Sequence, residues 1–205
     1  MASMRMGTTA RWMLLAFTVA ALLAIEIRLT HGPRERMDTA LRATARWSFV
    51  LFWLATCGGA LRTLFGARFK PLTVHARDLG LSFASAHLVH LALVMWMYGV
   101  ADPHLSARTV IVFGIGALWT YLLALLSFNE TSSWFGVRTA RILRLMGVEY
   151  ITVVFFIDFN KDAFGGGLSR SAYYAPFLIL AAAGPLLRVA AAIRRMTLGP
   201  ALAAS

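Results

Sequence analysis

The stretch from Leu79 to Tyr98 contains twenty residues and no charged side chain, and this stretch most limits what the chain can fold into. A helix needs about 20 predominantly apolar residues to cross the hydrocarbon core of a bilayer. His87 and His90 lie in the middle of the stretch. An imidazole at that depth has no water to bind, so it needs another side chain, a proton path or a metal centre as its partner. The spacing of three residues predicts that both rings lie on one face of a helix.

Apolar blocks of similar length recur along the chain, in which 59% of the residues are hydrophobic. They predict an all-α integral membrane bundle of about six transmembrane helices that forms one domain over residues 1–205. The predicted spans are residues 12–25, 47–64, 79–98, 109–128, 143–157 and 173–189. The fifth is the least apolar because Arg144 and Glu149 interrupt it. The first block could instead be a secretory signal, but no clean cleavage site of small residues precedes Glu26.

The net charge of +11 comes almost entirely from arginine. The arginines lie between the apolar blocks, which favours contact with lipid headgroups and disfavours a nucleic-acid partner. Six spans would put both termini on one side, with twelve lysines and arginines against eight on the other. This bias predicts cytoplasmic termini in a bacterial inner membrane. The predicted first loop carries five of the other eight: Arg28, Arg34, Arg36, Arg42 and Arg46.

Several modules are absent from the sequence. No Gly-x-Gly-x-x-Gly or Walker motif follows a strand pattern, so we expect no flavin or nicotinamide site. If the protein moves electrons, they must come from a partner. The single cysteine, Cys57, excludes an internal disulfide, and beside two glycines it is best explained as a small buried residue at a helix contact.

The segment Ala-Arg-Asp-Leu-Gly-Leu-Ser-Phe at residues 76–83, followed by His90, resembles the third-helix signature of the ferric-reductase-like transmembrane superfamily. Residues 44–62 and 122–132, and the pattern Arg144-Leu145 with Tyr150, are similar to its second, fourth and fifth helices. Small bacterial members include the haem-binding membrane subunit of the periplasmic methionine sulfoxide reductase system. The resemblance implies that His90 is a haem ligand. Arg77 stands where the family has an arginine. By this resemblance Arg77 could pair with a haem propionate, or it could simply flank the span.

The sequence departs from this family in the fifth helix, where the family has further haem-ligating histidines. The matching positions here are Met146 and Phe159, and no histidine follows His104. A haem between histidines of the third and fifth helices therefore cannot form. Three interpretations remain for His90: it binds haem b with Met146 as second ligand, it or His87 holds a five-coordinate haem, or no haem is bound and the histidines are hydrogen-bonded in the interior.

Glu149 is a carboxylate inside a predicted span, which makes it a candidate functional residue with a partner. Arg144 is five residues away, a poor spacing for a pair on one helix. We therefore expect His87 or His90 to be the partner, unless the fifth span starts late and leaves Glu149 near the interface.

These residues predict a cytochrome-b-like subunit that carries electrons from a cytoplasmic flavoprotein or quinol toward a periplasmic acceptor. Such a subunit is not catalytic on its own, because the cofactor carries the redox chemistry. One alternative is a haem-free structural or assembly protein of the same fold. The other is a small transporter or proton channel in which Glu149 and the two histidines form a relay.

Overall fold

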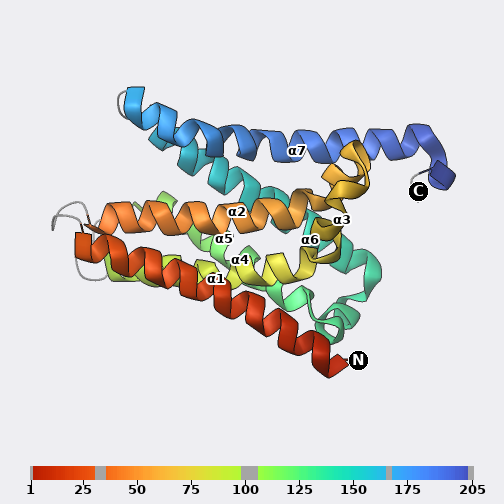
Figure 1. Cartoon of the computed structure of the whole chain (residues 1–205), viewed down its shortest axis with the longest axis horizontal. Coiled ribbons are helices and arrows are strands. Elements are labelled where there is room, and N and C mark those ends of the chain that lie inside the picture. The colour runs from red at the N-terminus through yellow and green to blue at the C-terminus, as the bar shows by residue number, and fades with distance from the viewer. Residues whose placement is uncertain (1, 31–35, 98–105, 165–167, 203–205) are drawn as a thin grey trace.

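The computed structural model describes residues 2–30, 36–97, 106–164 and 168–202, and these residues are all-α (Figure 1). The elements in chain order are α1 (Ala2–Thr30), α2 (Arg36–Phe65), the short 3-10 helix η1 (Ala67–Phe69), α3 (Lys70–Val74), α4 (Ala76–Trp96), α5 (Ala107–Leu126), α6 (Asn129–Phe164) and α7 (Leu168–Leu202). Five segments are long and apolar enough to cross a membrane: Gly7–Thr30, Met37–Phe65, Ala76–Trp96, Ala107–Leu126 and Ser171–Thr197. An all-α integral membrane protein is thus confirmed.

The long helices run alternately up and down the bundle (Figure 1). We call the end that holds both chain termini the terminal end. α2 and α5 finish there and α4 begins there. We call the opposite end the loop end. α1 and α4 finish there, and α2, α5 and α7 begin there. α2 is central, since it packs against α1, α4 and α7, while α6 packs between α5 and α7.

Phenylalanines fill the centre where α2, α4, α6 and α7 meet. Phe49 is fully buried, and its ring centroid lies 5.1 Å from that of Phe155 and 4.9 Å from that of Phe159. Phe52 and Phe83 extend this cluster, with centroids 5.2 Å apart. Such edge-on and tilted contacts suit the quadrupoles of the rings and bury large apolar areas. The helices are therefore held by an aromatic core as well as by the bilayer.

All six long helices begin earlier than the predicted spans, and α2 and α6 differ most from the prediction. α2 begins at Arg36 rather than Trp47, so Arg42 and Arg46 are helical and do not belong to a loop. Asp38 explains part of the extension, because its carboxylate pairs with Arg42 one turn later at 2.8 Å. Arg34, expected in the same loop, lies outside the described residues. α6 begins at Asn129, is broken at Gly136, where φ is 72°, and then continues to Phe164.

Arginines close the ends of neighbouring helices at the terminal end. The Nη2 of Arg144 in α6 donates to the carbonyl of Leu126, the last residue of α5, at 2.5 Å. The Nη1 of Arg194 in α7 donates to the carbonyl of Leu64 in the last turn of α2 at 2.7 Å. The last four carbonyls of a helix have no partner within it, and a cation there also complements the helix dipole. These arginines therefore hold helices together in addition to meeting lipid headgroups.

Candidate functional site

The two histidines of α4 lie together, as their spacing predicts. Their ring centroids are 5.3 Å apart and their planes differ by 28°. His90 also reaches α2, where its Nδ1 lies 3.1 Å from the Oγ1 of Thr44. A stacked pair of imidazoles is therefore fixed to two helices of the bundle.

The hydrogen bonds of Thr44 define the tautomer of His90. The single hydroxyl proton of Thr44 is donated to the carbonyl of Ala40 at 2.8 Å. The hydroxyl oxygen can then only accept from His90, so the Nδ1 of His90 carries the ring proton. The lone pair of the neutral ring is left on Nε2. A ring whose Nδ1–H is held by a second residue is the arrangement found for histidines that bind a metal.

His87 presents a different polar atom. Its Nδ1 is buried and has no hydrogen-bond partner. On its other side the ring contacts Phe83, with centroids 5.6 Å apart. Buried polar atoms are normally satisfied, so an orphaned nitrogen next to His90 marks this part of α4 as a candidate site. Within the described residues no group of three or more His, Cys, Asp or Glu side chains could hold a metal ion.

The structure does not bring a second axial ligand from α6 to His90. Met146 is 54% exposed. It precedes the buried Phe155 by nine residues, which places the two on opposite faces of α6. Phe159, the other position at which the family has a histidine, is 1% exposed and packs against Phe49. The structure therefore brings neither Met146 nor Phe159 to His90.

Arg77 lies far from the histidines. It is in the first turn of α4, thirteen residues before His90, which corresponds to about 20 Å along the helix. Its guanidinium lies 5.7 Å from the ring centroid of Phe128, and its side chain is exposed. The structure thus places Arg77 as a flank at the terminal end, and it does not bring Arg77 to His90.

Glu149 pairs with an arginine of α7 and not with a histidine, so that expectation was wrong. The Nε and Nη2 of Arg188 donate to the two carboxylate oxygens of Glu149 at 3.1 and 2.9 Å. α6 packs mainly against α5 and α7 rather than against α4, which carries the histidines. An arginine of α7 is therefore within reach of Glu149. Arg188 appears in the sequence as a flank at the end of the last span, but that span continues to Thr197. With its carboxylate held by Arg188, Glu149 gives no support to a relay through the histidines.

The ion pair belongs to a polar cluster between α2, α6 and α7. The thiol of Cys57 lies 3.9 Å from the Nη1 of Arg188, and the indole of Trp53 donates to the carbonyl of Leu180 at 2.8 Å. Gly184 lies beside these groups, and a Cβ there would be in ordinary van der Waals contact with the Cys57 sulfur at 3.4 Å. The cluster therefore satisfies polar groups within membrane-spanning segments, where each unsatisfied group costs several kcal/mol.

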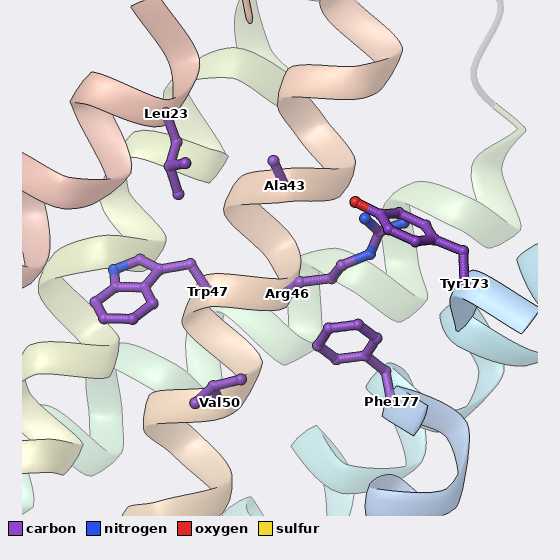
Figure 2. Close-up of a pocket in the computed structure, with 7 residues that line it drawn as sticks. All are labelled: Leu23, Ala43, Arg46, Trp47, Val50, Tyr173 and Phe177. Atoms are coloured by element: carbon purple, nitrogen blue, oxygen red, sulfur yellow. The ribbon is translucent and has the colours of Figure 1, made fainter. Parts of the chain in front are cut away.

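Arg46 is a second residue whose importance the sequence does not reveal. It projects from α2 toward α7, where Tyr173 and Phe177 flank it (Figure 2). Only 8% of Arg46 is exposed, which is unusual for an arginine. The clue in the sequence is its position one residue before Trp47, at the start of the apolar run.

No protein-family model matches the chain, and no curated protein or solved structure matches it either. The resemblance to the ferric-reductase-like superfamily is therefore carried by the short motifs of the sequence alone.

Proposed function

We propose that the chain is a membrane-embedded electron-transfer subunit of the ferric-reductase-like type that holds one haem b through His90. The observation that carries this proposal is the hydrogen bond between Thr44 and the Nδ1 of His90, which leaves Nε2 free to bind iron. The buried, unpartnered nitrogen of His87 lies beside it. His87 is the alternative ligand.

The course of the chain supports six crossings. α5 and α7 both run from the loop end to the terminal end, so α6 has to carry the chain back through the bundle (Figure 1). Its charged residues are the reason that composition alone does not mark it as a span. The Glu149 carboxylate is paired with Arg188, and this pairing lowers the free-energy cost of placing α6 in hydrocarbon. With six crossings, the excess of arginine and lysine places both termini in the cytoplasm of a bacterial inner membrane.

The residues of the chain would position the cofactor and set its access. Thr44 fixes the plane and the tautomer of the His90 ring, and His90 would hold the iron through Nε2. Haem supplies one-electron chemistry when bound. The donor would be a cytoplasmic flavoprotein or quinol, and the acceptor a periplasmic protein, because the chain carries no nucleotide-binding motif of its own.

A haem-free structural or assembly protein is the second candidate, and one observation favours it. The fifth-helix position at which the family has a histidine is Phe159, which packs with Phe49, Phe155 and Phe177 in the aromatic core. An interior filled by phenylalanines needs no cofactor to be stable.

The visible spectrum of the purified protein distinguishes these candidates. We expect a Soret band that shifts when carbon monoxide is added to the reduced protein, because a haem with one protein ligand has an open face. His90→Ala should abolish the band. The control is His75→Ala, which removes a histidine at the terminal end that pairs with Asp78. A featureless spectrum from haem-supplied cells would contradict haem binding and support the haem-free candidate.

Thr44 provides a second, independent test. Thr44→Val keeps the shape of the side chain but removes the acceptor for His90 Nδ1, so we expect haem affinity to fall about 10- to 100-fold. Thr44→Ser retains the hydroxyl and should retain most of the affinity. Haem titration of the apoprotein measures both. Equal affinities for the valine and serine variants would show that Thr44 does not orient the ligand.

A further inference from the structure

We propose that a groove between α1, α2 and α7 binds the anionic headgroup of a membrane lipid, with Arg46 as its anchor. This site is separate from the histidine pair and goes beyond electron transfer. It lies on the part of α2 that is nearer the loop end.

The groove has a volume of about 280 Å³ and combines an apolar wall with a single cation. Figure 2 shows Arg46 extending from α2 to the ring of Tyr173, above Phe177. Trp47 projects from α2 to the other side, toward α1. The indole nitrogen of Trp47 already donates to the carbonyl of Ala16 at 3.0 Å, so this side chain offers the groove only its apolar surface. The remaining lining residues are apolar: Leu23, Ala43 and Val50.

The guanidinium of Arg46 is incompletely satisfied. Its central carbon lies 4.0 Å from the ring centroid of Tyr173, 4.2 Å from that of Tyr174 and 5.5 Å from that of Phe177. These rings stabilise the positive charge by cation–π interaction. They do not replace a hydrogen-bond acceptor, and the buried Nε of Arg46 has none. A buried donor on a charged group is costly without a hydrogen bond, so an added acceptor at Nε would stabilise Arg46.

An oxyanion would supply what is missing. Phosphate oxygens match the planar fork of a guanidinium and can accept from two of its nitrogens at once. Tyr173, whose ring lies 4.0 Å from the guanidinium, is 63% exposed, so this ring has space to turn aside for a ligand. Charge complementarity thus selects an anionic ligand over a neutral or cationic one.

The position of the groove selects a lipid as the source of that anion. Its three walls all come from segments that can span a membrane, so the groove opens toward the bilayer. Arg46 lies nine residues after the start of the Met37–Phe65 span, about 14 Å along the helix. A long arginine side chain can extend from there toward the headgroups. The apolar wall would accept the first part of an acyl chain.

The test is native mass spectrometry of the full-length protein in detergent. The protein is titrated separately with phosphatidylglycerol, with phosphatidylcholine of the same acyl chains, and with glycerol 3-phosphate. We expect phosphatidylglycerol to be retained about tenfold more strongly than phosphatidylcholine, and glycerol 3-phosphate not to be retained. Arg46→Gln should remove the difference between the lipids.

Two further variants make the result specific. Arg28→Gln changes the net charge equally at the exposed loop end of α1, where the guanidinium lies 5.8 Å from the ring centroid of Trp96, and should keep the preference. Ala43→Phe fills the groove without altering Arg46 and should abolish retention, even if Arg46→Gln proves too unstable to purify. Equal retention of both lipids by the native protein, or an unchanged preference in Ala43→Phe, would overturn the proposal. If glycerol 3-phosphate were retained as strongly as phosphatidylglycerol, the anion would not have to come from a lipid, and this part of the proposal would be wrong.

Discussion

Arg188→Met is expected to lower the free energy of unfolding by about 2–3 kcal/mol. The substitution leaves the Glu149 carboxylate without the two hydrogen bonds that it accepts at 3.1 and 2.9 Å. Removing one partner of a fully buried pair typically costs about 3–5 kcal/mol. The cost here is smaller because a carboxylate that has lost its cation in an apolar surrounding can take up a proton and become neutral. Unfolding in mixed micelles by sodium dodecyl sulfate, followed by circular dichroism, measures the change.

A double-mutant cycle separates the ion pair from the packing of Arg188. Glu149→Gln removes the charge that the first variant leaves unpaired. The double variant Glu149→Gln with Arg188→Met should therefore be more stable than Arg188→Met alone, so that the two single effects are not additive. Additive losses would mean that the pair contributes nothing and that only the packing of the two side chains matters.

Gly58→Ala is expected to destabilise the protein by about 2 kcal/mol, within the range for overpacked sites. α3 approaches α2 at this glycine, and a Cβ at residue 58 would lie 2.8 Å from the Cβ and 3.0 Å from the carbonyl carbon of Leu72. These atoms belong to the backbone or are fixed to it, so no rotamer change can relieve the contact. α3 would have to move away from α2. The same detergent unfolding measurement detects the loss.

The adjacent glycine is the matched control. A Cβ at Gly59 meets nothing within 4 Å. Gly59→Ala should therefore be neutral or stabilising by up to about 1 kcal/mol, because alanine is the better helix former. Equal effects of the two substitutions would show that helix propensity, and not the contact with Leu72, determines both.

The sequence predicts the helical class of this protein well because the bilayer imposes one dominant constraint. Runs such as Leu79 to Tyr98 have the length and apolarity that spanning helices need, and α4 is found there over Ala76–Trp96. Periodicity also places His87 and His90 side by side. Helix boundaries near charges are predicted less well. Arg42 and Arg46 resemble loop residues by composition, although one pairs with Asp38 and the other is enclosed by aromatic rings.

Partners across the bundle could not be predicted from the sequence. The choice between a histidine and Arg188 as the partner of Glu149 depends on which helix lies beside α6. Hydropathy locates most of the long helices but does not reveal which helices are neighbours. The outward position of Met146 has the same origin, since the face of α6 that is buried depends on α5 and α7. Spacing within one helix is encoded locally, whereas contacts between helices are a property of the packed bundle.

The packing of α7 against α2 has a consequence for biosynthesis. α2 emerges early from the ribosome, yet Trp53, Arg46 and the carbonyl of Leu64 find their partners on α7, which is made after α6. Until α7 enters the membrane, Arg46 lacks its aromatic enclosure and Glu149 lacks its counter-ion. A nascent chain that ends before α7 therefore exposes two charged side chains to lipid at once. Synthesis of α7 supplies the partners of both side chains, so a chain truncated before α7 would carry two unpartnered charges in the membrane.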